Sequence, residues 1–197
     1  MSTTIYYVRH ASYENPERLV PGRIPGYHLN TAGKEKAQKV SEFFKGKSVK
    51  YIYTSPLERC FETANIIGES LPKAKIIHVY DLIEIDSTNW QAFRLEELFT
   101  NEYYESYLNN PNTDEVIENL SKLAARMKNL TLTFCAKHKG EEIICVSHED
   151  PILALRLALE NKPLHLLRTY KAAMGSITTF VFDDNCHFLK DEYLEII

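Results

Sequence analysis

Short apolar runs rich in β-branched and aromatic residues recur along the chain, separated by polar or helical segments. The run at residues 5–8 is typical of a buried strand, and residues 49–53 alternate in polarity as strand residues do. The last two runs lie close together, and an Asp-Asp-Asn turn signal separates them. The pattern predicts strands at residues 5–8, 49–53, 75–79, 143–146, 177–182 and 188–194.

Segments with apolar residues at helical spacing lie between these strands. Residues 31–45 place an alanine, a valine and a phenylalanine on one face, and a glycine follows as a stop signal. Residues 55–70 open with a capping box, a serine and a glutamate three positions later, with a proline in the first turn. An Asp-Pro pair similarly opens residues 150–159. We therefore expect a helix over each of these segments.

The alternation of strands and helices predicts an α/β fold with a mostly parallel central sheet and helices on both faces. From Trp90 to about Lys139 the pattern is helical and carries no strand signal. The first part of this region, with several tyrosines before an Asn-Asn-Pro sequence, predicts a helical insert at about 86–115 over the C-terminal edge of the strands. No linker-like stretch or internal repeat divides the chain, so we expect residues 1–197 to form a single domain.

Composition narrows the class of protein. Of the 197 residues, 44% are hydrophobic and 25% are charged, with only 7 glycines and 8 prolines. This supplies a sizeable core and excludes a disordered, collagen-like or disulfide-stapled chain. The 23 basic and 27 acidic residues give a net charge of -4, so no general positive field attracts nucleic acid or an anionic membrane. We expect neither as a partner, and any bound anion must be held by a local cluster of cations.

The four cysteines, Cys60, Cys135, Cys145 and Cys186, are scattered and show no metal-ligand or Cys-x-x-Cys spacing. Cys60 and Cys145 lie in apolar runs, where cysteine usually acts as a small core residue. The N-terminal segment lacks a basic stretch followed by a long apolar one, and no run approaches the roughly 20 apolar residues of a membrane span. These features predict a soluble protein of a reducing compartment, the cytoplasm, without a metal or cofactor.

Cationic and titratable residues follow three of the predicted strands. Arg9 and His10 come directly after the first strand. Arg59 lies in the first turn of the helix after the second strand, and His148 follows the fourth strand. Taken singly, each has an ordinary explanation as a surface arginine, a helix-face arginine or a core histidine. Because the C-terminal ends of parallel strands meet at one edge of a sheet, we expect all four to converge on one pocket suited to a phosphoryl group.

Several separated motifs together resemble the histidine phosphatase (phosphoglycerate-mutase-like) superfamily over almost the whole chain. Val8-Arg9-His10-Ala11 is similar to the signature, with alanine in a position usually held by glycine. Residues 55–64, SPLERCFETA, resemble the second-arginine motif most closely. Further similar segments are residues 22–33, the acid-residue segment 82–86 followed by Trp90, and Val146-Ser147-His148-Glu149. Departures lie at residues 13–16, at Thr88 and Ala92 and at 111–115, around the pocket mouth, and they bear on substrate identity.

The resemblance implies a covalent mechanism and assigns roles to residues. His10 is the implied nucleophile, attacking phosphorus to form a phosphohistidine. Arg9, Arg59 and His148 are expected to hold the phosphoryl oxygens and to match the charge of the transition state. Glu149, beside His148, joins them as a substrate-binding residue.

The resemblance also implies a carboxyl group that protonates the leaving oxygen and then activates water. Glu84 is the expected general acid, with Asp81, Asp86 and Glu14 as its rivals. No step of this chemistry needs a metal ion.

A second anionic group of the substrate has several candidate partners. Arg23 is the best candidate because its Gly-Arg-x-x-Gly setting places it on a loop shortly after the signature. Arg18, His28 and Arg94 are the other candidates.

The leading hypothesis is a metal-independent phosphatase that hydrolyses phosphomonoesters of small metabolites or of a phosphoprotein. A phosphoglycerate-type phosphomutase is the alternative, but it must shield its phosphohistidine from water, and the chain is short for the cap segments that this requires. A non-catalytic phosphate-binding module is the third hypothesis, and the complete set of catalytic residue types argues against it. Assays of phosphoesters with and without a chelator would separate these hypotheses.

Overall fold

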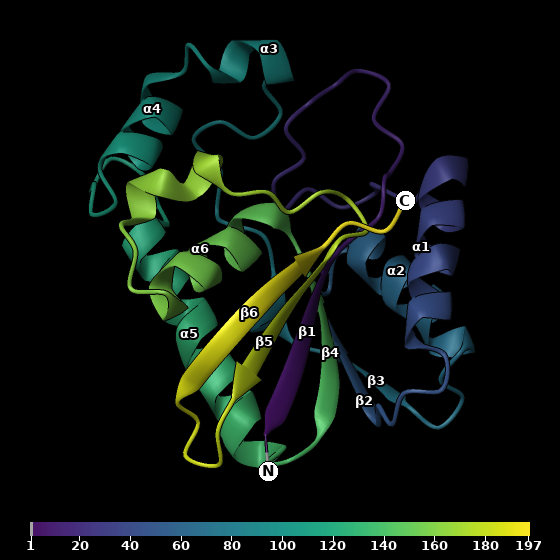
Figure 1. Ribbon diagram of the computed structural model, residues 1–197. Coiled ribbons are helices and arrows are strands. Elements are labelled where there is room, and N and C mark those ends of the chain that lie inside the picture. The colour runs from purple at the N-terminus through teal and green to yellow at the C-terminus, as the bar shows by residue number, and fades with distance from the viewer. Residues whose placement is uncertain (1) are drawn as a thin grey trace.

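The computed structural model describes residues 2–197, and in this part of the chain six strands form one sheet with helices on both faces (Figure 1). The strands are β1 (Thr3–Arg9), β2 (Tyr51–Thr54), β3 (Lys75–His78), β4 (Glu142–Ser147), β5 (Ile177–Phe182) and β6 (Phe188–Leu194). They lie in the order β3-β2-β4-β1-β5-β6. The strands from β3 to β1 are parallel, and β5 and β6 extend the sheet in antiparallel fashion.

Side chains of the central strands alternate between two apolar layers. In β1, Ile5 and Tyr7 belong to one layer, and Tyr6 and Val8 belong to the other. Tyr6 lies opposite Ile144 of β4, which belongs to the same layer. Strands covered on both faces are apolar nearly throughout, which explains why these runs were recognisable in the sequence.

Helices cover both faces of this sheet. They are α1 (Thr31–Phe44), α2 (Glu58–Glu69), α3 (Leu95–Leu98), α4 (Glu102–Asn109), α5 (Leu120–Lys137) and α6 (Glu149–Leu159), with the short 3₁₀ helices η1 (Tyr80–Leu82) and η2 (Leu164–Thr169). Helices α1 and α2 pack over the layer of Tyr6, and α5 and α6 pack over the layer of Tyr7 (Figure 1). Helices α3 and α4 lie beyond the C-terminal edge of the parallel strands. The expected fold class is therefore confirmed.

Helix α2 begins later than its capping signal predicted. Its N-cap is Leu57, and no side chain caps it. The hydroxyl of Ser55 instead forms a hydrogen bond of 2.9 Å with Nε2 of His148. The capping box with Glu58 was therefore a wrong prediction, because the serine binds a side chain of a neighbouring loop.

Helix α6 begins earlier than predicted. Its N-cap is His148, and Asp150, which was expected to be the cap, lies inside the first turn. The carboxylate of Asp150 binds the guanidinium of Arg168 at 2.5 Å. A tertiary ion pair thus takes the place of the predicted local hydrogen bond.

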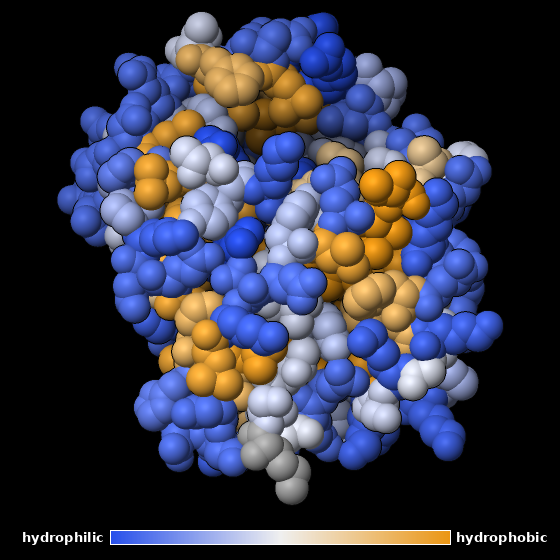
Figure 2. Space-filling model, in the orientation of Figure 1, coloured by the Kyte–Doolittle hydropathy of each residue, from blue (hydrophilic) through white to orange (hydrophobic). Residues whose placement is uncertain are grey.

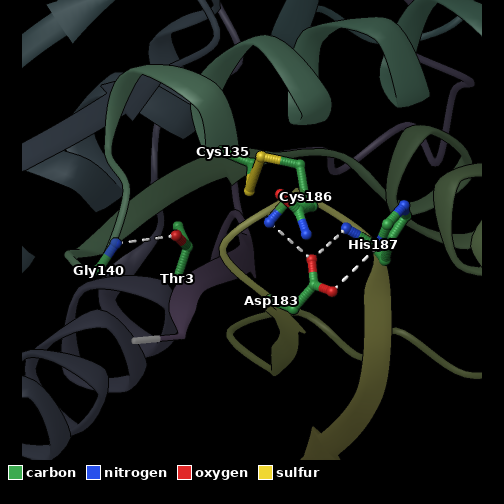
Figure 3. Close-up of a disulfide and its surroundings, with 7 residues drawn as sticks. Thr3, Cys135, Gly140, Asp183, Cys186 and His187 are labelled. Carbon is green, nitrogen blue, oxygen red and sulfur yellow. Dashed lines mark hydrogen bonds and ion pairs between the residues drawn. A yellow bond between two sulfur atoms is a disulfide. The ribbon is translucent and has the colours of Figure 1, made fainter.

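A disulfide joins Cys135 of α5 to Cys186 in the turn between β5 and β6 (Figure 3). Asp183 shapes this turn, because its carboxylate accepts hydrogen bonds from the backbone amides of Asn185 and His187 at 2.9 and 2.8 Å. The expectation of reduced thiols is wrong for this pair, which is separated by 51 positions in the sequence. Disulfides persist in oxidising surroundings, so the cysteine pattern no longer supports a reducing compartment.

The burial of the other two cysteines agrees with the expectation from the sequence. The other two cysteines, Cys60 and Cys145, are free and buried. Within residues 2–197, no helix has both the length and the apolar character needed to cross a membrane.

Candidate active site

The C-terminal ends of the parallel strands bring four titratable or cationic residues together, and three of them, His10, Arg59 and Glu84, line one pocket of about 140 Å³. The fourth, His148, is fully buried and is not part of the lining. His10 directly follows β1, and Arg59 lies in the first turn of α2 after β2. Glu84 follows β3 and η1. His148 follows β4, and its ring centroid lies 5.2 Å from that of His10. The convergence that the sequence predicted is thus seen in the structure.

The hydrogen bonds of His10 fix the positions of its proton and its lone pair. Nδ1 lies 2.8 Å from the carbonyl oxygen of Ala11, and a carbonyl only accepts, so Nδ1 carries the proton. Nε2 accepts a hydrogen bond of 3.3 Å from Nε of Arg59, and a guanidinium only donates. Burial, together with the charges of Arg59 and Arg9, holds the pKa of His10 well below its usual value. His10 is therefore neutral at physiological pH, with its lone pair on Nε2.

The two arginines offer buried N–H groups to an anion. Arg59 is fully buried and donates through Nη2 to the carbonyl oxygen of Gly22 at 2.8 Å. Arg9 donates through Nη1 to the carbonyl oxygen of Ala172 at 2.7 Å and pairs through Nη2 with Glu149 at 3.0 Å. Nη1 of Arg59 and Nε of Arg9 are buried and have no hydrogen-bond partner among the described residues. Buried donors of this kind are rare in proteins, and a bound anion would satisfy both of them.

Glu84 has an environment suited to proton transfer near neutral pH. Burial, reinforced by the negative charge of Asp150, raises the pKa of Glu84 to about 7, although Arg59 and Arg9 oppose the shift. One carboxylate oxygen accepts a hydrogen bond of 2.9 Å from the backbone amide of Ile85. The other lies 3.7 Å from Nδ1 of His148. Glu84 therefore populates both its protonated and its ionised form at neutral pH.

His148 is neutral in this pocket. Burial lowers its pKa well below the usual value, and the nearby charge of Arg59 lowers it further. Nε2 of His148 is hydrogen bonded to the hydroxyl of Ser55 at 2.9 Å. The neutral ring can offer one N–H group to a ligand.

The structure places Arg23 outside the lining of the pocket, which argues against its expected role in substrate binding. Its guanidinium pairs with Asp86 at 3.1 Å and with Glu118 at 2.9 Å. Its Nε donates to the backbone carbonyl oxygen of Glu84 at 2.9 Å. Arg23 is thus held by two carboxylates and a carbonyl, and it supports the segment that carries Glu84.

The other candidates for a second anionic group also lie outside the pocket lining. Nδ1 of His28 lies 2.5 Å from the carboxylate of Glu62 on the surface. Arg94 is exposed and lies 4.0 Å from Glu96. Arg18 is exposed on a loop. The rivals to Glu84 as general acid, Asp81, Asp86 and Glu14, do not line the pocket either.

Sequence reasoning missed an ion pair at the rim of the pocket. Arg168 of η2 binds both carboxylate oxygens of Asp150, at 2.5 and 2.9 Å. Tyr107 donates to Asp150 at 3.0 Å, and Arg168 donates to the hydroxyl of Tyr104 at 3.0 Å. This cluster ties α4 to α6 beside the pocket. The Asp-Pro pair was the available signal, but it was interpreted as a helix cap, and Arg168 lies in no motif.

Clusters of three or more His, Cys, Asp or Glu side chains arranged to hold a metal ion do not occur in the described part of the chain.

Comparisons with known proteins identify the family of the chain. The sequence matches the histidine phosphatase superfamily (branch 1) over residues 5–192. It is 34% identical over 159 residues to phosphoglycerate mutase-like protein 4 of Arabidopsis thaliana, covering 77% of this chain and 68% of that protein. It is 29% identical over 157 residues to phosphoserine phosphatase 1 of Hydrogenobacter thermophilus, covering 77% of this chain and 74% of that protein.

The fold is also similar to a solved structure, phosphoserine phosphatase from Entamoeba histolytica in complex with 3-phosphoglyceric acid. The TM-score is 0.85 at 24% identity, and the match covers 98% of this chain and 97% of the other. The chain therefore belongs to the histidine phosphatase superfamily, branch 1, as an enzyme of the phosphatase or phosphomutase type.

Proposed function

We propose that this protein is a metal-independent phosphatase that hydrolyses phosphomonoesters through a phosphohistidine on His10. The observation that carries the proposal is the neutral Nε2 of His10 beside two arginines, each with a buried N–H group that lacks a partner among the described residues. These groups suit the attack on a phosphoryl group and the binding of its oxygens. The similarity to a protein named phosphoserine phosphatase supports hydrolysis as the outcome.

In the first step, Nε2 of His10 attacks phosphorus in line with the ester bond. The N–P bond forms as the bond between phosphorus and the leaving oxygen breaks. Protonated Glu84 gives its proton to that oxygen, so the product leaves as a neutral alcohol. Arg9, Arg59 and His148 hold the phosphoryl oxygens and offset the charge that spreads over them in the transition state.

In the second step, the ionised carboxylate of Glu84 takes a proton from a water molecule. The oxygen of that water attacks phosphorus, and the N–P bond breaks. Inorganic phosphate leaves, neutral His10 is restored, and Glu84 is protonated again. A carboxyl group with a pKa of about 7 serves both steps, because neither of its forms is rare at neutral pH.

A phosphomutase would use the same first step and then pass the phosphoryl group to a second alcohol. Because the chain is similar to phosphoglycerate mutase-like protein 4, the experiment must distinguish this transfer from hydrolysis. Hydrolysis is distinguished from this transfer by its products. Release of inorganic phosphate and alcohol in equal amounts supports the phosphatase, whereas conversion of one phosphomonoester into another without net release of phosphate supports a mutase.

The proposal is tested with His10→Ala, for which we expect loss of turnover on every phosphomonoester while the circular dichroism spectrum stays unchanged. His28→Ala is the matched control, because His28 is an exposed histidine outside the pocket lining, and it should keep wild-type activity. Acid-labile, alkali-stable phosphate should become attached to the wild-type chain and not to His10→Ala. Activity should survive a chelator and be inhibited by vanadate. Retained activity in His10→Ala would rule out the covalent mechanism. If a chelator abolished activity and a divalent metal ion restored it, metal independence would be ruled out.

A further inference from the structure

The pocket has two chemically different walls. The inner wall carries the charged groups, and the outer wall, built by residues 20–22 and 85–98, is mostly apolar, with the hydroxyl of Ser87 as its polar group. Backbone hydrogen bonds join these segments, since Val20 N donates to Phe93 O at 2.8 Å and Leu95 N donates to Arg18 O at 2.8 Å. The outer wall is therefore a fixed part of the pocket. Its apolar side chains are those of Val20, Pro21, Ile85, Trp90, Leu95 and Leu98.

The apolar wall continues onto the surface at the pocket mouth. Leu95 lines the pocket and is 37% exposed, while Phe93 is 42% and Phe99 is 80% exposed. The ring of Phe99 packs edge-on against Tyr104, which also lines the pocket, with ring centroids 6.3 Å apart. Figure 2 shows a hydrophobic patch at the top of the molecule, over α3 and beside a recess. A contiguous exposed apolar patch of this kind marks a binding surface.

Among the described residues, the rim of the pocket offers no unpaired cation for a second anionic group. Of the described residues that line the pocket, the cations are Arg9, Arg59 and Arg168. Both carboxylate oxygens of Asp150 bind Arg168, at 2.5 and 2.9 Å. Asp150 and Glu149 also place two carboxyl groups on the lining. A carboxylate on the leaving group would therefore meet acidic groups and an arginine that is already paired.

We propose that the preferred substrates are phosphomonoesters whose leaving group is uncharged and carries an alkyl or aryl portion that binds the apolar wall under α3. This inference rests on the proposed phosphatase function and specifies its substrate class. The phosphoryl group binds at Arg9 and Arg59, and the leaving group extends past Leu95 toward the exposed patch. Phosphoserine and 3-phosphoglycerate, whose leaving groups carry a carboxylate, are then poor substrates of this chain.

The first experiment measures kcat/KM for ethyl, butyl and hexyl phosphate, together with phosphoserine and 3-phosphoglycerate. All five are esters of aliphatic alcohols, so differences in leaving-group acidity are small. We expect kcat/KM to rise roughly tenfold or more from ethyl to hexyl phosphate, as buried methylene groups add binding energy. Equal values along the alkyl series, or faster hydrolysis of either carboxylate-bearing ester, would overturn the inference.

The second experiment compares two leucine substitutions. Leu95→Asn places an amide on the apolar wall. It should lower the ratio of kcat/KM for hexyl phosphate to kcat/KM for ethyl phosphate by at least about threefold, which corresponds to the burial of one methylene group. Leu189→Asn is the matched control, because Leu189 is 57% exposed on β6 and lies outside the pocket lining, and the rise should persist there. Equal rises in the two variants would mean that the wall at Leu95 does not bind the substrate.

A binding measurement separates this inference from the proposed function. Calorimetric titration of the wild-type protein with ethyl-, butyl- and hexylphosphonate and with 3-phosphonopropionate requires no turnover. Binding that tightens from ethyl- to hexylphosphonate and is weakest for 3-phosphonopropionate supports the apolar subsite. If this order is found but no ester is hydrolysed, only the phosphatase proposal fails. Hydrolysis of the esters without this order of affinities overturns the subsite and leaves the phosphatase proposal standing.

Discussion

At the scale of single residues, the proton on Glu84 decides which esters the enzyme can cleave. Glu84→Gln keeps the size of the side chain and removes the proton donor. An alkoxide leaves slowly without a proton, whereas a nitrophenolate leaves with little help. We therefore expect Glu84→Gln to slow alkyl phosphates by roughly 10²–10⁴ and aryl phosphates distinctly less, measured as kcat on both ester types.

Asp86→Asn is the control for this substitution. Asp86 is the carboxyl group two positions from Glu84, and it pairs with Arg23 outside the pocket lining. Its substitution should affect both ester types equally, through the support of the Glu84 segment. Equal losses on the two ester types in Glu84→Gln would show that Glu84 only shapes the pocket.

The raised pKa of Glu84 also sets the pH dependence of the first step. The working form is the protonated acid, and its population falls as pH rises through about 7. We expect kcat/KM for an alkyl phosphate to decrease on the alkaline side of pH 7 in the wild type, and this limb to be absent in Glu84→Gln. The pKa of His10 lies well below its usual value, so protonation of the nucleophile should not limit the rate near pH 6.5. An alkaline limb that survives in Glu84→Gln would assign it to another group.

At the scale of elements, the sequence predicted the strands better than the helix starts. The central strands are apolar runs buried on both faces. Residues 177–182 and 188–194 coincide with β5 and β6, although β6 has no fully buried residue. The starts of α2 and α6 were missed because the polar residues expected to cap them bind side chains elsewhere. Ser55 binds His148, and Asp150 binds Arg168. Local patterns do not contain partners that the fold brings together.

The same reasoning explains which parts of the site were predictable. Residues at the ends of parallel strands must meet, so the convergence of His10, Arg59 and His148 followed from the order of elements. The position of Arg23 did not follow, because its partner Glu118 lies on another segment of the chain. The apolar wall was missed for a different reason: apolar residues in a helical region are usually part of a core. The assigned roles of the site residues stay predictions.

The disulfide gives a prediction about the C-terminal hairpin. It ties α5 to the turn between β5 and β6 (Figure 3). This turn lies at the end of the sheet opposite the C-terminal ends of the parallel strands (Figure 1), where the residues that line the pocket are found. Closing a loop of 51 positions restricts the unfolded chain, so the double substitution of Cys135 and Cys186 by serine should lower the free energy of unfolding by about 2–4 kcal/mol. Urea unfolding measures this loss, and kcat should stay within about twofold of wild type because the pocket is distant.

Reducing agent provides the control for this prediction. Dithiothreitol should destabilise the wild type to the level of the double variant and should leave the double variant unchanged. The free cysteines, Cys60 and Cys145, are buried and do not contribute to this difference. Equal stability of wild type and double variant without reductant would show that the bond does not stabilise the fold in solution.

At the scale of the whole molecule, the site places three titratable groups in a buried environment, and their shifted pKa values link stability to pH. Burial lowers the pKa of both His10 and His148 from 6.5, so below pH 6.5 the unfolded chain binds protons that the folded chain does not. Each histidine therefore makes the fold less stable as pH falls. Glu84 acts in the opposite direction, because its pKa is raised from 4.5 to about 7, and the folded chain keeps a proton that the unfolded chain releases. Its contribution is lost as pH rises from 4.5 to 7.

Two variants separate these contributions when each is compared with wild type by urea unfolding at pH 5, 6 and 7. His148→Gln removes a group that disfavours the fold in acid, so its free energy of unfolding should rise relative to wild type by on the order of 1 kcal/mol per pH unit as pH falls below 6.5. Glu84→Gln should gain relative to wild type as pH rises toward 7. His28→Gln is the control, because Glu62 raises the pKa of the exposed His28. As pH falls, the free energy of unfolding of His28→Gln should decrease slightly relative to wild type, whereas that of His148→Gln should increase. Parallel curves for wild type and His148→Gln would mean that His148 titrates freely in the folded protein, and the neutral pocket on which the proposed mechanism rests would have to be abandoned.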